Sequence, residues 1–176
     1  MIVLGIDPGA TGAVVVLEVK DDFRLTGAFR VVDWDRCFPD GLLSSDILTE
    51  FERKNSIVFA FIEEQKPFAK GGRQMGAKSA FALGENFGFW RGAMGQYANV
   101  EVVPVHAWQR YHFGSGTTIS DPKVRSMRAA AQKWPDFPVD GKHGRADALL
   151  IALYGVAWVK AKKKGGVGNV GRNDGS

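Results

Sequence analysis

The order of the apolar runs along the chain constrains its fold more than any other feature of the sequence. Three runs rich in β-branched residues come first, at residues 2–6, 13–19 and 23–32, with short polar turns between them. Such runs predict three antiparallel strands joined as a meander. After them, strand-like runs alternate with runs of helical spacing. This order predicts an α/β protein with a mixed five-stranded sheet that helices cover on both faces.

Two further strands and five helices complete the predicted order. We expect the strands at residues 57–62 and 100–105, and the helices at residues 44–54, 75–94, 106–112, 122–133 and 144–159. With 176 residues, 45% of them hydrophobic, the chain can bury a core of its own. We therefore expect one domain over residues 1–160 and a basic, glycine-rich flexible tail over residues 161–176.

Glycine recurs every four residues in the predicted helix over residues 75–94, at Gly84, Gly88 and Gly92. This spacing gives one face of the helix a smooth stripe that another backbone could approach closely. Close packing of the helix against its own sheet is the simpler interpretation. Contact with a second chain is the alternative, and if the protein is a dimer we expect this helix at or near the interface.

Cysteine content and the start of the chain exclude several classes of protein. Cys37 is the single cysteine, which excludes an intramolecular disulfide framework and a zinc site built from several cysteines. The chain begins MIVLGIDPGA and has no basic leader or apolar run of the length of a signal peptide or a spanning helix. We expect a soluble protein of a reducing compartment with no membrane partner.

Positive charge is concentrated in three clusters. Residues 66–83 and 122–134 each carry four cations and no acid, and four lysines lie at residues 160–164, in a chain of net charge +4. A solvated helix face explains any one cluster equally well, but three in one small domain favour a phosphate backbone as the partner. The candidate DNA-contacting residues are Phe68, Lys70, Arg73, Lys78, Lys123, Arg125 and Arg128.

Phe68 lies in a predicted loop over residues 66–74, among glycines and cations. An exposed aromatic side chain can wedge between bases at a branch point, where stacking is already broken. Burial of Phe68 in the core is an equally good interpretation.

Three carboxylates lie at the ends of apolar elements. Asp7 and Glu63 each end an apolar strand, and Asp147 lies near the start of an apolar helix. Because burial of an unpaired charge is costly, each needs a cation, a metal ion or hydrogen-bond donors. Asp7 could instead cap its turn, and Asp147 could simply be favoured by the helix dipole. Together the three carboxylates form the oxygen-rich pattern that Mg²⁺ prefers, and such ions can promote phosphodiester hydrolysis.

Three segments of the chain resemble the motifs of one family. Residues 5–12, GIDPGATG, resemble the first strand and turn of the RuvC-type Holliday junction resolvases, of the ribonuclease H-like superfamily. IEEQ at residues 62–65 resembles their second acidic motif, and HGRADALLIA at residues 143–152 their last. The similarity covers roughly residues 1–160 and is closest to the short phage-type branch.

This resemblance implies a ribonuclease H-like fold and a homodimer that nicks four-way DNA junctions in pairs, in DNA recombination and repair. It implies Mg²⁺ or Mn²⁺ as the cofactor, and a cytoplasmic location in a bacterium or a phage-infected host cell. By the same resemblance the catalytic and metal-binding residues are Asp7, Glu63, His143 and Asp147.

Two of these assignments have competitors nearby in the sequence. Glu64 competes with Glu63, but side chains alternate along a strand and the Ile-Glu-x-Gln pattern selects Glu63. His143 lies one turn before Asp147, where the family places a further ligand, and Asp140 is the alternative to it.

Other functions share parts of the pattern. Sugar-kinase and actin-like ATPases also end their first strand in an acidic residue and a Gly/Thr-rich turn, but they are generally much longer, and no second phosphate loop is visible in this sequence. Retention of all three carboxylates argues against a non-catalytic module that binds branched nucleic acid. A nuclease of flaps, forks or RNA–DNA hybrids is the main alternative, because it would use the same chemistry.

Overall fold

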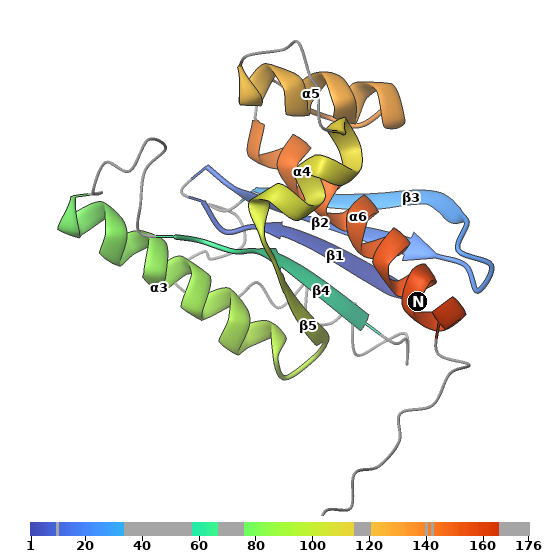
Figure 1. Cartoon of the computed structure of the whole chain (residues 1–176), viewed down its shortest axis with the longest axis horizontal. Coiled ribbons are helices and arrows are strands. Elements are labelled where there is room, and N and C mark those ends of the chain that lie inside the picture. Colours follow the sequence, from blue (N-terminus) through green and yellow to red (C-terminus); the bar gives the residue numbers. More distant parts are fainter. Residues whose placement is uncertain are drawn as a thin grey trace, which may run out of the picture.

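The computed structural model describes residues 1–9, 11–33, 58–66, 76–114, 121–139, 141 and 143–165 of the chain. Within these ranges five strands form one sheet in the order β3-β2-β1-β4-β5 (Figure 1). The strands are β1 (Ile2–Asp7), β2 (Ala13–Val19), β3 (Leu25–Asp33), β4 (Val58–Glu63) and β5 (Asn99–Val103). The first three form the predicted antiparallel meander, whereas β4 pairs in parallel with both β1 and β5. The predicted mixed sheet is therefore confirmed.

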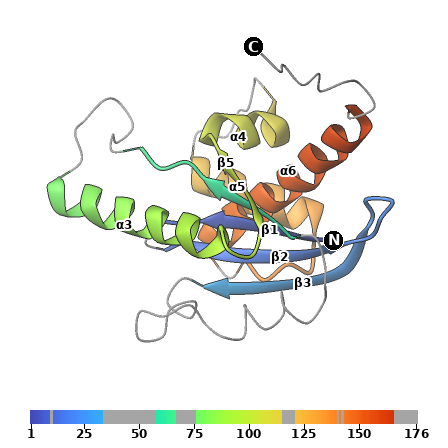
Figure 2. The same ribbon diagram turned by 90° about the horizontal axis from the view of Figure 1, so that it is seen from below.

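Helices cover both faces of this sheet, as predicted (Figure 2). One face carries α3 (Ala77–Met94), and the other carries α4 (Val105–Phe113), α5 (Pro122–Lys133) and α6 (His143–Gly165). Because side chains alternate along a strand, β1 contributes to two separate apolar cores. Val3 packs in the core under α6, and Leu4 and Ile6 pack in the core under α3. The central strand is thus buried along its whole length.

Glycines allow α6 to lie directly on the sheet. A Cβ at Gly5 of β1 would overlap the backbone of α6 at Ala148 and Ala152, and a Cβ at Gly144 would overlap the backbone of Thr11. The first turns of α6 therefore touch both β1 and the turn that follows it. This contact brings the N-terminal end of α6 to the carboxyl end of β1.

The start of α5 is fixed by its own sequence. Asp121 caps the helix, because its side chain accepts a hydrogen bond of 2.8 Å from the backbone N–H of Lys123. Pro122 occupies the first turn, where no N–H is needed. The capped first turns of α5 lie against α6 and turn Ser126 into the protein, where it is 2% exposed.

The structure departs most from the predicted boundaries at two places. The third strand begins at Leu25 rather than residue 23, because Phe23 takes a positive φ of 66° in the turn before it. α6 continues to Gly165, five residues past the predicted domain end at residue 160. Lysines are good helix formers and are favourable near a helix C-terminus, which accounts for this extension. The predicted helix over residues 44–54 and residues 67–74 of the predicted loop lie outside the described part of the chain.

The glycine stripe of α3 does not pack on the sheet. Among the described residues, a Cβ added at Gly84, Gly88 or Gly92 would meet nothing within 4 Å. The interpretation as close helix–sheet packing is therefore wrong. Two large apolar residues of the same helix are also exposed, Phe81 by 73% and Phe89 by 38%.

Candidate active site

Asp7 and Glu63 meet at one edge of the sheet because their strands are parallel neighbours. Ile6 of β1 pairs with Ile62 of β4, so the residue that follows each of them lies at the same carboxyl edge. Asp147 reaches this edge from the other direction, one turn into α6. Three distant parts of the sequence therefore bring a carboxylate to one place, as the pattern of apolar elements predicts.

Asp7 is almost completely buried, with 8% of its surface exposed. Its Oδ1 atom accepts a hydrogen bond of 2.9 Å from the backbone N–H of Gly9. Burial raises the pKa of Asp7 to about 6, although this hydrogen bond acts in the opposite direction. Asp7 therefore caps its turn. The single N–H of Gly9 does not fully stabilise the negative charge of its buried carboxylate.

Glu63 receives a hydrogen bond on each carboxylate oxygen. The indole N–H of Trp108 donates to Oε1 over 3.1 Å, and the side-chain amide of Gln65 donates to Oε2 over 3.1 Å. Burial and the negative charges of Asp7 and Asp147 nevertheless raise the pKa of Glu63 to about 8. The competing Glu64 forms an ion pair of 3.1 Å with Lys66 instead.

Asp147 carries an acceptor without a donor. Burial, followed by the charge of Asp7, raises its pKa to about 7, while a hydrogen bond from Ser126 and the charges of Arg125 and Lys123 lower it. Its Oδ1 atom is buried and has no hydrogen-bond partner within the described residues. A buried acceptor without a donor in a native site indicates a place for an ion or a water molecule, or a functional role.

The donor set fits a divalent cation that prefers oxygen ligands. Each carboxylate pKa is raised by burial, and those of Glu63 and Asp147 are raised further by neighbouring negative charge. A cation placed among these carboxylates would remove that repulsion and supply a partner for the Asp147 Oδ1 atom. In the part of the chain that the structure describes, no three His, Cys, Asp or Glu side chains are already gathered tightly enough to hold a metal ion.

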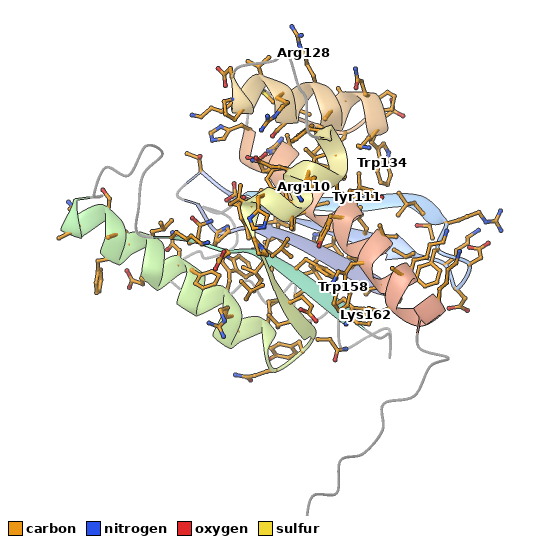
Figure 3. All side chains as sticks on the ribbon, viewed as in Figure 1. Arg110, Tyr111, Arg128, Trp134, Trp158 and Lys162 are labelled. Atoms are coloured by element: carbon orange, nitrogen blue, oxygen red, sulfur yellow. The ribbon has the colours of Figure 1, made fainter. Side chains whose placement is uncertain are left out.

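Arg125 lies beside the carboxylates and not on an open surface. Its guanidinium donates to the side-chain oxygen of Gln109 over 3.2 Å and lies 4.5 Å from the ring centroid of Phe113. Its positive charge lowers the pKa of Asp147. Lys123 is exposed at the start of α5, and Arg128 points from α5 away from the sheet (Figure 3). In the predicted basic cluster of α5, Arg125 is therefore partly buried beside the site, whereas Lys123 and Arg128 are exposed to solvent.

His143 is the first residue of α6 and is partly buried. Its pKa is lowered by burial and by Lys123, and raised by Asp121. Lys123 and Asp121 belong to the start of α5, so His143 lies at that side of the site. Its role as a ligand stays a prediction.

Lys78 is exposed in the first turn of α3. Other predicted residues lie outside the described part of the chain, namely Phe68, Lys70, Arg73 and Asp140.

Sequence reasoning missed three polar side chains of this site. Gln65, Trp108 and Ser126 each hydrogen-bond to one of the carboxylates. Gln65 could have been found, because it is the glutamine of the Ile-Glu-x-Gln pattern. Trp108 and Ser126 come from α4 and α5, and no spacing in the sequence connects them with residues 63 and 147.

Solved structures with the same architecture place this fold in the ribonuclease H-like class. RuvC from Thermus thermophilus in complex with a Holliday junction substrate matches with a TM-score of 0.53 and 18% sequence identity, over 92% of this chain and 96% of that one. A second structure of Thermus thermophilus RuvC matches with a TM-score of 0.51 and 19% identity over the same shares. No protein-family model and no curated protein matches the sequence. The predicted ribonuclease H-like fold is therefore confirmed by structure and not by sequence similarity.

Among the described helices, none combines the length and the apolar character that a membrane crossing requires.

Proposed function

We propose that this chain is a divalent-metal-dependent endonuclease that nicks branched DNA, with the four-way junction as its main substrate. The observation that carries the proposal is the meeting of Asp7, Glu63 and Asp147 at one edge of the sheet, with a buried acceptor on Asp147 that lacks a donor. The likeness to a RuvC structure that is bound to a Holliday junction substrate supports the choice of DNA.

Asp7, Glu63 and Asp147 would hold Mg²⁺ or Mn²⁺, with His143 as a further ligand at the α5 side of the site. Once bound, the ion supplies the positive charge that lowers the pKa of water and stabilises the leaving oxygen of a phosphodiester. The protein contributes the positions of the carboxylates: the N–H of Gly9, the Ser126 hydroxyl and the donors to Glu63 hold them. Arg125 adds a fixed positive charge next to Asp147.

The DNA backbone would lie against the start of α5 and the segment of the chain that follows Glu63. Exposed Lys123 and Arg128 on α5 fit contacts with phosphates, which supply most of the affinity of nonspecific DNA binding. Phe68, Lys70, Arg73 and Lys78 complete the proposed DNA-contacting set. We expect the enzyme to act in the cytoplasm of a bacterium or a phage-infected host cell, on junctions formed in recombination and repair.

A dimer fits this substrate, because a four-way junction has approximate two-fold symmetry and its resolution needs two cuts. The exposed stripe of Gly84, Gly88 and Gly92 on α3, with Phe81 beside it, supports α3 as the contact between subunits. A face without Cβ atoms lets two helices approach closely, as in small-residue helix contacts.

The experiment that tests the proposal compares wild type with Asp7→Asn on a labelled four-way junction, with Mg²⁺ or Mn²⁺ present and then removed by chelation. We expect the variant to lose at least about 100-fold in cleavage rate and to bind the junction normally, because binding depends on phosphate contacts. Asp136→Asn, at an exposed position after α5, is the matched control and should cleave normally.

Near-normal nicking by Asp7→Asn would refute the assignment of the site. Flaps, forks and RNA–DNA hybrids belong in the same experiment, because a nuclease of any of these would use the same carboxylates. A clear preference for one of them over the four-way junction would change the proposed substrate and leave the proposed chemistry standing.

A further inference from the structure

Trp108 is a buried side chain that donates to one of the three carboxylates without itself being a proposed metal ligand. It is 1% exposed, and its indole N–H donates to Glu63 Oε1 over 3.1 Å. β5 pairs in parallel with β4, with Val103 opposite Glu63, and α4 begins two residues later at Val105. Trp108 therefore lies one turn into α4, above the end of β4, and the course of the chain fixes it there.

The hydrogen bond from Trp108 comes from a more rigid donor than the one from Gln65. The Trp108 ring packs edge-on against Phe113, with ring centroids 6.2 Å apart, and lies within the core beneath α6. Gln65 lies beyond the end of β4 and is only partly buried. A glutamate side chain has several rotatable bonds, so a fixed donor on one oxygen restricts the orientation of the whole carboxylate.

The same helix also supports the other side of the site. Gln109 accepts a hydrogen bond from Arg125, and the ring of Phe113 lies under its guanidinium. The His112 ring lies 2.6 Å from the backbone carbonyl of Leu150, which ties α4 to α6 next to Asp147. α4 thus contacts groups on both sides of the three carboxylates, although none of its residues is one of them.

We propose that Trp108 is a positioning residue of the nuclease, whose indole N–H fixes the Glu63 carboxylate beside Asp7 and Asp147. This inference rests on the proposed function. A carboxylate oxygen has two lone pairs, so a hydrogen bond to Oε1 leaves capacity to bind a cation. Loss of a group that hydrogen-bonds to a metal ligand in this way typically lowers metal affinity or activity by about 10–100-fold.

The first test replaces Trp108 by phenylalanine, which keeps an aromatic ring in the core and removes the N–H. We expect a loss of about 10–100-fold in the cleavage rate at saturating junction, with unchanged affinity for the junction. Trp158→Phe is the matched control, because Trp158 packs edge-on against Phe61 of the same strand at 5.6 Å and lies away from Glu63. An equal loss of activity in both variants, at equal melting temperature, would overturn the proposal.

The second test does not depend on cleavage or on the folding of a Trp108 variant. The chain has five tryptophans, so the ¹H–¹⁵N spectrum of the folded protein should contain five indole cross-peaks. Glu63→Gln should shift the Trp108 cross-peak and leave that of Trp158 in place, and titration with Mg²⁺ should shift the Trp108 peak in wild type more than in Glu63→Gln. A Trp108 cross-peak that ignores both changes would overturn the proposal.

These outcomes separate the two proposals. A wild-type protein that cleaves no branched DNA with either metal would refute the nuclease, while the indole shift would still show whether Trp108 holds Glu63. Cleavage by wild type that Trp108→Phe leaves intact would refute the role of Trp108 and leave the nuclease standing.

Discussion

The two helices with conspicuous glycines, α6 and α3, use them in opposite ways. In α6, Gly144 and Gly155 lie where a Cβ would overlap the turn after β1 or the ring of Phe61, so these glycines let the helix lie on the sheet. In α3, Gly84, Gly88 and Gly92 face open space within the described structure. The α6 glycines are explained by contacts within the chain. Those of α3 are not, and the proposed contact with a second chain would explain them.

The largest expected effect concerns the contact between α6 and β1. Gly5→Ala would push a methyl group into the backbone of Ala148 and Ala152, which cannot rotate away. We expect the free energy of unfolding to fall by about 3 kcal/mol or more, as for a severe overpacking of the core. Chemical denaturation followed by circular dichroism measures this.

At a protein concentration that keeps the subunit monomeric, Gly88→Ala is the matched control for Gly5→Ala, because an alanine in an exposed helix stabilises it by about 0.5–1 kcal/mol. Equal stability of the two variants would contradict the claim that the glycine at the contact between β1 and α6 is needed for close packing and that those of α3 are not.

The next effect follows from the carboxylates that the close packing of α6 buries. The pKa of Asp7 is raised from 3.8 to about 6 in the folded protein, so the folded state holds this proton over a pH range in which the unfolded state has lost it. Its contribution to stability is therefore present at low pH and is lost as the pH rises from about 4 to about 6. Without metal, Asp7→Asn should become more stable than wild type over this range, by about 1–3 kcal/mol at pH 8.

Asp7→Asn must be compared with wild type at each pH, because the titration of His112 changes the stability of both proteins in the opposite direction. Its pKa is lowered from 6.5 to about 4, mainly by burial, so stability falls as the pH drops through this range. The difference between Asp7→Asn and wild type cancels this contribution. A difference that stays flat from pH 4 to pH 8 would show that Asp7 is not held in a destabilising environment.

A substitution on the exposed face of α3 should have the smallest effect on the stability of the subunit. It should nevertheless clearly weaken the dimer. Gly88→Glu places a charged side chain in the open stripe, so we expect the dimer to dissociate at least about tenfold more readily while the subunit stays folded. Ala131→Glu, at an exposed position of α5, makes the same change of charge elsewhere and should leave the dimer intact. Sedimentation velocity at micromolar concentration measures this, and a wild type that stays monomeric both free and on DNA would contradict the proposed interface.

The sequence predicts most of the sheet and much of the site for one physical reason. A carboxylate that directly follows an apolar strand lies at the edge of the sheet, and parallel strands bring such residues together, so Asp7 and Glu63 could be paired in advance. The sequence does not distinguish the two glycine sets, because a glycine at helical spacing looks the same whether a backbone or solvent faces it. Nor does it connect Trp108 with Glu63, since that contact depends on the place of α4 above β4.

The end of α6 illustrates a different limit. The run of lysines from residue 160 and the glycines after it indicate a solvated tail, yet the helix continues to Gly165. Lys160 and Lys163 lie 5.9 and 5.4 Å from the ring centroid of Phe23, and Lys162 lies 4.9 Å from that of Trp158. These contacts between cations and aromatic rings come from distant parts of the chain, and local composition does not reveal them.

The central claim is that Asp7, Glu63 and Asp147 form one site for a divalent cation, and titration calorimetry with Mn²⁺ at pH 6.5 tests it most directly. Wild type should bind Mn²⁺ and release protons, because the raised pKa values of the three carboxylates leave protons for the cation to displace. Asp7→Asn, Glu63→Gln and Asp147→Asn should each weaken binding strongly, and Asp136→Asn should not. Undiminished Mn²⁺ affinity in Asp147→Asn, with the same proton release as wild type, would contradict the account.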